Sequence, residues 1–414
     1  MVKSNLKIVI SGHVDHGKST LIGRLLLDTN SLPEERIKEI RKISKELGKD
    51  TELAYLTDYL KEERENEMTI DTTQIFFKTR KRDYVIIDSP GHVEFIKNML
   101  TGATQAEAAV LLIDANAGVK EQTKRHAYIV GLLGITNVIV VLNKMDLLDY
   151  KEERFQKLKL EFLEFMQRLA MKPCFIIPAS AKDGVNISKR SRKMSWYKGP
   201  CLLETLDSIK SKAKPVEKPL RFSVQDVYEI NGEKIIAGKV LSGTIKQGQD
   251  IRLFPSQKDS RVNSIKVFGK MLREARAGAS IGLTLDGPFY ARRGEIIAQR
   301  ENGRLHLLNR FRTDIFWMSG EPLQINKPVT LRCSTQELTC VAEKIEKRID
   351  SSTLEILEEN ASELRMNESG VVMLKTEKPA VIEKFDFIDE LGRFVIEQEN
   401  NLQGAGIITQ NFNP

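Results

Sequence analysis

Short apolar runs alternate with longer segments of helical periodicity through the first half of the chain, from Leu6 to about Ser180. A buried parallel strand is a continuous apolar run, and the helix that follows it carries apolar residues three and four positions apart. The pattern therefore predicts a parallel sheet wrapped by helices. We expect strands at Leu6–Ser11, Thr73–Lys78, Tyr84–Asp88, Ala108–Ile113, Asn137–Asn143 and Cys174–Pro178, and helices at Lys18–Leu27, Glu94–Thr101, Gln122–Leu133 and Glu152–Leu169.

The pattern changes beyond Lys210–Pro219, a segment with two prolines and no apolar periodicity that is typical of an exposed linker. Short β-rich runs follow, separated by turn signals such as Asn231-Gly232, and a second set of runs begins after about Asn302. We predict one α/β domain with a mixed, mostly parallel sheet and helices on both faces, followed by two antiparallel β-barrel domains. The expected domains are 1–213, 214–303 and 304–414. The expected barrel strands are Arg221–Val227, Lys234–Leu241, Asp250–Phe254, Ser264–Val267, Arg312–Trp317, Val329–Cys333, Ala380–Phe385 and Gly392–Ile396.

Composition adds modest limits. The formal net charge of +7 would suit an anionic partner such as RNA, a nucleotide or an acidic protein face, but Lys and Arg are interspersed with Asp and Glu, as on a solvated mixed surface. The four cysteines contain no C-x-x-C pair, which favours a reducing cytoplasm over a disulfide framework. No segment approaches ~20 consecutive apolar residues, so we expect no membrane span.

A glycine-rich loop follows the first expected strand and opens directly into a helix, with the spacing G-x-x-x-x-G-K-[ST]. In such a loop the backbone N–H groups surround the α- and β-phosphates of a nucleotide at the positive end of a helix. Lys18 is expected to bridge the β- and γ-phosphates, and the Ser19 hydroxyl to ligate magnesium. The expected nucleotide contacts here are Gly12, His13, Val14, Asp15, His16, Gly17, Lys18, Ser19 and Thr20.

Asp88-Ser89-Pro90-Gly91-His92 ends another expected strand and places an acid near the mouth of that loop. Asp88 is expected to hold magnesium through a water, and the Gly91 amide to approach the γ-phosphate. His92 is expected to orient the attacking water, the alternative being a helix-start histidine with no catalytic part. Thr69 is expected to reach magnesium and the γ-phosphate only when GTP is present, which makes residues 35–69 a candidate switch segment. A plain solvated helix end is the alternative for that segment.

Asn143-Lys144-Met145-Asp146 follows a further strand and decides which purine fits. A carboxylate at Asp146 accepts hydrogen bonds from guanine N1–H and its 2-amino group, whereas adenine has neither donor and would leave the acid unpaired. Ser180-Ala181-Lys182, after the last strand, is suited to contact the guanine O6 through its backbone. The chain is therefore expected to bind GTP or GDP with magnesium and to hydrolyse GTP, using Asn143, Lys144, Asp146, Ser180, Ala181 and Lys182 for the base.

These motifs in this order, followed by two β-domains, resemble the translational GTPase superfamily, in its branch around elongation factor Tu and elongation factor 1-alpha. Within that branch the chain looks most similar to the GTPase large subunit of bacterial sulfate adenylyltransferase. The stretches that suggest it are Gly17–Leu26, Asn98-Met99, Thr101-Gly102-Ala103, Met194–Pro200, Phe316-Trp317-Met318 and Gly392–Ile396. Asn66-Glu67 stands where that family usually has Gln-Gly, and the loop carries His13 and His16 as in translation factors.

That resemblance implies a GTPase subunit that couples GTP hydrolysis to ATP-dependent sulfate activation on a partner, the small catalytic subunit, in a heterodimer or larger complex. Two alternatives remain open. One is an elongation-factor-type GTPase that delivers aminoacyl-tRNA to the ribosome. The other is a GTP switch that acts as an assembly factor on another complex.

Overall fold

The computed structural model describes residues 5–32, 73–88, 106–210, 215–230, 232–267, 270–287, 291–301 and 305–410. The expected helix Glu94–Thr101, the candidate switch segment and the site residues Thr69, Gly91 and His92 lie outside the described residues. The chain divides into two compact units. Unit 1 comprises Met1–Lys212 with Ser352–Leu354, and unit 2 comprises Ala213–Ser351 with Glu355–Pro414.

Unit 1 is built on a six-stranded sheet in the order β2-β3-β1-β4-β5-β6. The pairs β3–β1, β1–β4, β4–β5 and β5–β6 are parallel, and only the edge strand β2 runs antiparallel, against β3. The central strands are nearly continuous apolar runs because both faces of the sheet are covered. The strands are β1 (Asn5–Gly12), β2 (Thr73–Lys78), β3 (Asp83–Asp88), β4 (Ala108–Asp114), β5 (Asn137–Asn143) and β6 (Phe175–Pro178).

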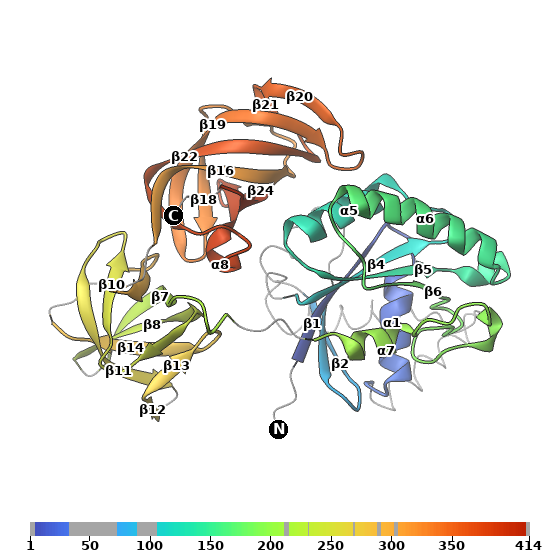
Figure 1. The fold of residues 1–414 in the computed structure, drawn as a ribbon, viewed down its shortest axis with the longest axis horizontal. Helices are drawn as coiled ribbons and strands as arrows, with labels where there is room; N and C mark the ends of the chain where they lie inside the picture. Colours follow the sequence, from blue (N-terminus) through green and yellow to red (C-terminus); the bar gives the residue numbers. More distant parts are fainter. Residues whose placement is uncertain are drawn as a thin grey trace. The chain divides into compact units, whose positions relative to one another are not determined.

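Helices cover both faces of this sheet, α1 and α7 on one side and α5 and α6 on the other (Figure 1). The core beneath α1 and α7 joins Leu21 and Leu25 to strand residues such as Ile8 and Ile86, all with 0% of their surface exposed. The helices are α1 (Lys18–Asp28), α5 (Glu121–Leu132), α6 (Glu152–Arg168) and α7 (Leu202–Ser208), with short 3-10 turns η2 (Met145–Leu148) and η3 (Arg192–Met194).

Unit 2 begins with a closed barrel. Its strands pair antiparallel in the order β10-β15-β7-β8-β14-β11, and a pairing of β10 with β11 closes the ring. Aliphatic and aromatic side chains such as Phe222, Ile251 and Leu283 fill its interior. The strands are β7 (Arg221–Ile230), β8 (Glu233–Ser242), β10 (Asp250–Phe254), β11 (Asp259–Val267), β14 (Ser280–Leu285) and β15 (Ile296–Gln299), with the short β9 (Thr244–Lys246), β12 (Lys270–Leu272) and β13 (Glu274–Arg276).

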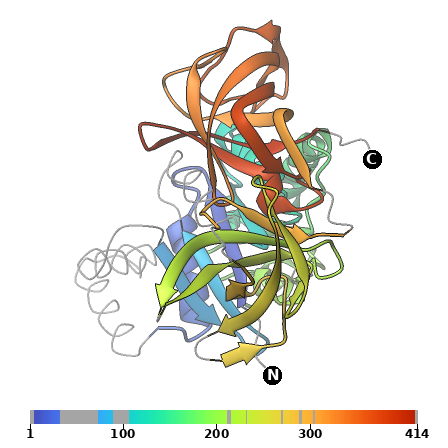
Figure 2. The same cartoon turned by 90° about the vertical axis from the view of Figure 1, so that its left-hand side faces the viewer.

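A second closed ring follows in the order β18-β23-β24-β16-β22-β19, again closed by a pairing between β18 and β19. Its strands are drawn in orange to red in Figure 2. Phe311, Ile345 and Leu374 lie in its core. The ring strands are β16 (His306–Trp317), β18 (Pro328–Cys333), β19 (Gln336–Asp350), β22 (Glu368–Ile382), β23 (Arg393–Gln398) and β24 (Asn401–Ile408), with β17 (Leu323–Gln324), β20 (Ile356–Ala361), β21 (Glu363–Leu364) and the single-turn α8 (Asp389–Gly392) outside it.

A buried ion pair joins the two barrels within unit 2. Arg221 Nε and Nη2 donate to Glu383 Oε1 at 2.9 and 2.7 Å, and the two side chains are 1% and 3% exposed. Arg221 Nη1 also donates to the carbonyl of Leu220 at 2.9 Å. Burying two charges is costly unless each is paired and hydrogen-bonded, so this contact makes the two barrels interdependent.

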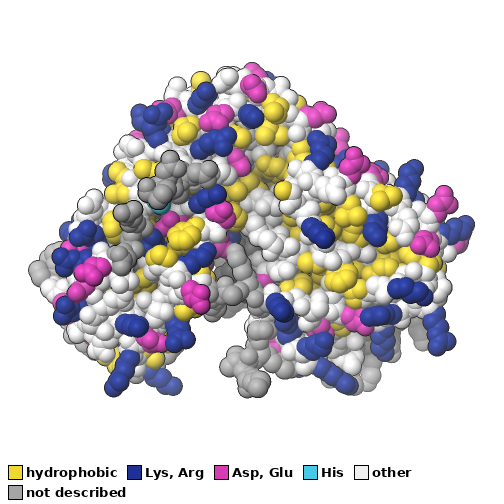
Figure 3. Space-filling view, viewed as in Figure 1, with side chains coloured by type: hydrophobic (Ala, Val, Ile, Leu, Met, Phe, Trp, Pro, Cys, Tyr) yellow, Lys and Arg dark blue, Asp and Glu magenta, His cyan; other side chains and the backbone are white. Residues whose placement is uncertain are grey.

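The predicted fold class is confirmed: a mixed, mostly parallel sheet with helices on both faces is followed by antiparallel barrels. The interspersed charges are visible as well, since Lys and Arg alternate with Asp and Glu over the face drawn in Figure 3. In the described part of the chain, no helix is long and apolar enough to cross a membrane. The expected strand Ala380–Phe385 is wrong in extent because β22 ends at Ile382, and Gly392 ends α8 where a strand start was expected.

Candidate functional site

The predicted nucleotide motifs meet at one edge of unit 1. The glycine-rich loop follows β1, the Asn143–Asp146 tetrad follows β5, and Ser180–Lys182 follows β6. Since these strands are parallel, their carboxyl ends share an edge of the sheet, which is where open α/β sheets bind ligands. Motifs more than a hundred residues apart in sequence are thereby brought together.

The phosphate loop has the backbone that its glycines require. Gly17 has φ +92°, and a Cβ built on it would lie 2.6 Å from Asn143 Nδ2, so a side chain there is excluded both by conformation and by space. Asp15 also has a positive φ, of 63°. Helix α1 starts at Lys18 with no side-chain cap and no acid in its first turn. The positive end of the helix dipole therefore faces the loop without a neutralising acid in the first turn, which favours an anionic ligand there.

The two loop histidines differ in environment. His16 is 2% exposed, and its Nδ1 lies 3.1 Å from the carbonyl oxygen of Leu112, to which it donates in the matching tautomer. Burial lowers the pKa of His16, so its ring is neutral at pH 7. His13 instead contacts the side-chain oxygen of Gln122 on α5. His16 thus supports the loop from below, while His13 ties it to a neighbouring helix.

Asn143 joins the phosphate loop to the loop that carries Ser180–Lys182. That loop is called the second base loop, and the loop of Asn143–Asp146 is the first. Asn143 Nδ2 donates to the carbonyl of His16 at 2.9 Å, and its Oδ1 accepts from the amide of Ala181 at 2.9 Å. The sequence motif predicts Asn143 as a base contact, and the second N–H of its Nδ2 group can still serve that role while both ends of the carboxamide bond to protein. Its structural part is therefore to hold two ligand-binding loops at a constant separation.

Lys144 is paired with a residue that the motif analysis missed. Its Nζ lies 2.8 Å from Asp114 Oδ2, at the end of β4, and its backbone is left-handed with φ 63°. Asp114 Oδ1 accepts from the amides of Asn116 and Ala117 at 2.8 and 3.1 Å. Burial raises the pKa of Asp114, but the bonds from Lys144 and the two amides outweigh it and hold the pKa below its usual value. An isolated acid at the end of an apolar strand gave no signal of this pairing.

Asp146 has a side-chain oxygen that lacks a hydrogen-bond donor. Its Oδ1 is buried and has no hydrogen-bond partner in the described part of the protein. A buried acceptor without a donor is costly, and a guanine N1–H or 2-amino group would supply the missing donor. Together with the uncapped α1 terminus, this orphaned oxygen shows that the residues present fit a guanine nucleotide.

Some of the predicted site residues lie wholly or partly outside the described residues. Asp88 ends β3, but its side chain lies outside the described residues, as do Thr69, Gly91 and His92 entirely. Ser19 and Thr20 lie in the first turn of α1, beside Lys18. Within the described ranges no three His, Cys, Asp or Glu residues are gathered as metal ligands. Of the expected magnesium ligands, the described ranges contain the Ser19 hydroxyl, and the Asp88 side chain and Thr69 lie outside them.

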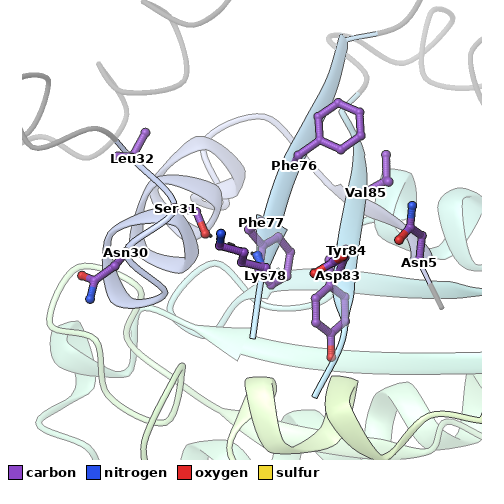
Figure 4. Close-up of a pocket in the computed structure, with 10 residues that line it drawn as sticks. All are labelled: Asn5, Asn30, Ser31, Leu32, Phe76, Phe77, Lys78, Asp83, Tyr84 and Val85. Atoms are coloured by element: carbon purple, nitrogen blue, oxygen red, sulfur yellow. Dashed lines mark hydrogen bonds between the residues drawn. The ribbon is translucent and has the colours of Figure 1, made fainter. Parts of the chain in front are cut away.

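A cavity of about 520 Å³ lies elsewhere in unit 1, and it is not part of this site. It is lined by Asn5, Asp83 and Lys78, at the end of the sheet opposite to Gly12, and by residues 30–32, which follow α1 (Figure 4). Phe77 and Tyr84 stack there with ring centroids 4.5 Å apart, and the Tyr84 hydroxyl donates to Asp207. The cavity therefore adjoins a structural contact, and none of the predicted nucleotide residues lines it.

Comparison with known families identifies the type of protein. The family described as "Elongation factor Tu GTP binding domain" matches residues 3–213, "Elongation factor Tu domain 2" matches 233–298, and "GTP-eEF1A C-terminal domain-like" matches 310–409. The chain belongs to this elongation factor family of translational GTPases. Its unit 1 is a GTP-binding domain, and GTP or GDP with magnesium is its ligand.

Curated relatives of the family match almost the full length. Elongation factor 1-alpha of Pyrococcus furiosus is 38% identical, and that of Thermococcus kodakarensis 39% identical, each over 98% of this chain and 97% of the relative. Elongation factor 1-alpha of Methanoregula boonei is 34% identical with the same coverage. A crystal structure of sup35 complexed with GDP shares 23% identity over 99% of this chain and 95% of that one, with a TM-score of 0.46, too loose a likeness to bear on function.

These relatives correct the expected role in sulfate activation. The sequence resemblance favoured the sulfate adenylyltransferase subunit and its small catalytic partner, but the relatives that cover this chain from end to end are named elongation factor 1-alpha. Several of the stretches that suggested the sulfate branch are shared with elongation factor 1-alpha, so those stretches could not separate the two branches. The prediction of sulfate chemistry is wrong.

Proposed function

We propose that this protein is an elongation-factor-type GTPase that carries aminoacyl-tRNA to the ribosome. The supporting observation is the end-to-end match to elongation factor 1-alpha, which leaves neither protein with a large unmatched segment. The net charge of +7 suits a polyanionic partner, and four free cysteines suit the reducing cytoplasm in which translation occurs. We keep 1–213, 214–303 and 304–414 as the proposed domain bounds.

In this proposal the residues of unit 1 divide the work of binding and hydrolysis. The amides of the loop Gly12–Ser19 hold the phosphates, Lys18 neutralises the β- and γ-phosphates, and Asp146 with the backbone of Ser180–Lys182 selects guanine. Ser19 and Asp88 hold the magnesium ion, which neutralises charge on the phosphates when it is bound. Thr69 and the Gly91 amide contact the γ-phosphate side, and His92 orients the attacking water.

The test is nucleotide-dependent binding of charged tRNA. The full chain is loaded with a non-hydrolysable GTP analogue or with GDP, and its binding to aminoacylated tRNA and to the same tRNA after deacylation is measured over a range of salt concentrations. A carrier binds the charged tRNA in the GTP-analogue state at least tenfold more tightly than in the GDP state, with affinity falling as salt rises. Equal binding of charged and deacylated tRNA in both states would contradict the proposal.

A further inference from the structure

The turn that carries Asp146 is held in an unusual backbone conformation. Three non-glycine residues between positions 144 and 150 are left-handed: Lys144 with φ 63°, Asp149 with φ 51° and Tyr150 with φ 57°. Each such residue costs roughly 1–2 kcal/mol relative to an ordinary conformation, so neighbouring contacts must compensate. Within the turn, the Tyr150 amide donates to the Met145 carbonyl at 2.9 Å.

Tyr150 is the residue through which this turn is anchored to its surroundings. The indole Nε1 of Trp196 donates to the Tyr150 carbonyl at 2.9 Å. The Tyr150 hydroxyl donates to Asp183 Oδ2, and Lys193 Nζ lies 3.0 Å from the same oxygen and 4.8 Å from the centre of the tyrosine ring. Burial raises the pKa of Tyr150, so the phenol keeps its proton and remains a donor.

Asp183 belongs to the second base loop. Ser180 and Val185 exchange backbone bonds of 3.1 and 3.0 Å and so form a tight turn, with Ala181 and Lys182 on one limb. From the α1 side, Arg24 Nε and Nη2 donate to the carbonyls of Ala181 and Lys182 at 3.2 and 2.6 Å. From the tetrad side, hydrogen bonds from Tyr150 and then Lys193 lower the pKa of Asp183, which keeps the acceptor ionised.

The two base loops are thus connected at two levels. At their roots, the amide of Met145 donates to the Ala179 carbonyl at 3.1 Å and the Asn143 carboxamide accepts from Ala181. Toward their tips, the Tyr150 hydroxyl donates directly to Asp183, and Lys193 Nζ donates to both the Tyr150 oxygen at 3.2 Å and Asp183 at 3.0 Å. Asp146 lies between these two levels on one loop, and Lys182 lies between them on the other. A guanine held by both loops depends on their separation.

We propose that Tyr150 is a positioning residue for guanine specificity, acting through its bond to Asp183 to hold Asp146 at the correct distance from the second base loop. The inference does not depend on the tRNA role, because it concerns only the base. Asp183 and Lys193 have side chains 31% and 53% exposed, and an exposed contact of this kind contributes little to folding. An effect of the Tyr150–Asp183 bond on base specificity can therefore be measured separately from its effect on folding stability.

The experiment compares GDP with IDP, whose base lacks the 2-amino group that Asp146 accepts from. Calorimetric titration of the nucleotide-free full chain with each nucleotide and magnesium gives the ratio of their dissociation constants. Tyr150→Phe removes only the hydroxyl. If the hydrogen bonds from guanine to Asp146 are then misplaced and lose ~1 kcal/mol, the affinity for GDP falls about fivefold. IDP has one bond fewer to lose, so the preference for GDP over IDP falls about threefold. Tyr228→Phe, at a tyrosine 51% exposed in unit 2, is the matched control and leaves both constants unchanged.

A second set of variants separates positioning from stability. Asp183→Asn keeps an oxygen that accepts from Tyr150 and retains the preference for GDP, whereas Asp183→Ala lowers it as Tyr150→Phe does. The double variant Tyr150→Phe/Asp183→Ala is no worse than Asp183→Ala alone, because Asp183→Ala already removes the bond that Tyr150→Phe removes. An unchanged GDP-to-IDP ratio in Tyr150→Phe, whatever its melting temperature, overturns the proposal, and so do additive effects in the double variant.

Discussion

The buried pair between Arg221 and Glu383 yields the most quantitative prediction for this protein. Replacing Arg221 with Met keeps most of the volume of the side chain but leaves the Glu383 carboxylate, 3% exposed, without its charged partner. Breaking a buried pair in this way costs about 3–5 kcal/mol, because the remaining charge stays desolvated. For a unit of this size, we expect the melting temperature of unit 2 to fall by roughly 6–20 °C.

Tryptophan fluorescence can follow unit 2 alone. The chain has two tryptophans, and Trp317, 1% exposed, is the one in the second barrel. In a Trp196→Phe background, denaturant unfolding monitored at Trp317 therefore gives the free energy of unfolding of unit 2. The matched control is Arg252→Met, which breaks a two-bond pair with Asp259 whose side chains are 36% and 33% exposed and should cost ~1 kcal/mol or less.

A double variant tests whether the unpaired charge causes the loss of stability. Arg221→Met/Glu383→Leu removes both charges together and should recover most of the lost stability, because an apolar pair of similar volume is often no worse than the ion pair. If Arg221→Met costs no more than Arg252→Met, the buried pair does not join the barrels as argued. A double variant as unstable as the single one would refute the desolvation argument.

The remaining predictions concern the nucleotide and pH. Asp146→Asn should weaken GTP binding about 100-fold or more and improve binding of xanthosine triphosphate, measured by competition with a fluorescent nucleotide, because the new amide presents a donor to the base. His92→Ala should retain GTP affinity while slowing single-turnover hydrolysis about 100-fold, and normal hydrolysis would remove His92 from the catalytic set. Burial, with Asp389 beside it, raises the pKa of Glu390 to about 7 despite Arg393 and despite Lys239 4.0 Å away. Its protonated form is favoured in the folded state, so the stability that it contributes below about pH 4.5 is lost as pH rises toward 7. In Glu390→Gln the midpoint of denaturant unfolding should therefore vary less with pH between 5 and 8.

Parts of the fold were predictable because local patterns and long-range packing agree there. The expected strands Thr73–Lys78 and Asn137–Asn143 are those of the structure, and the helix expected at Glu152–Leu169 ends one residue earlier. In the barrels the expectation missed β19, whose fifteen residues mix charged and apolar positions with two register shifts. At each register shift the buried positions change from even to odd residue numbers or the reverse. The simple alternation of apolar and polar residues is therefore lost over the strand.

The candidate site was predictable as a set of motifs but not as a structure. Spacing alone located the phosphate loop and the tetrad, because backbone geometry around phosphates demands particular glycines. The partners of those motifs were missed: Asp114 beneath Lys144, and Tyr150 with Asp183 beside Asp146. These residues come from strand ends and turns with no characteristic local pattern, and only the parallel sheet brings them together.

Asn143 shows why the two halves of nucleotide recognition are coupled in this fold. A single carboxamide donates to the His16 carbonyl in the phosphate loop and accepts from the Ala181 amide in the base loop. An aspartate at 143 has the same shape and can still accept from Ala181, but it cannot donate to His16 and would place a charge against a carbonyl. We therefore expect a ligand that shifts the phosphate loop to strain a contact that the base loop shares. An aspartate at position 143 should accordingly weaken binding of both the phosphates and guanine, which titration of Asn143→Asp with GDP would measure.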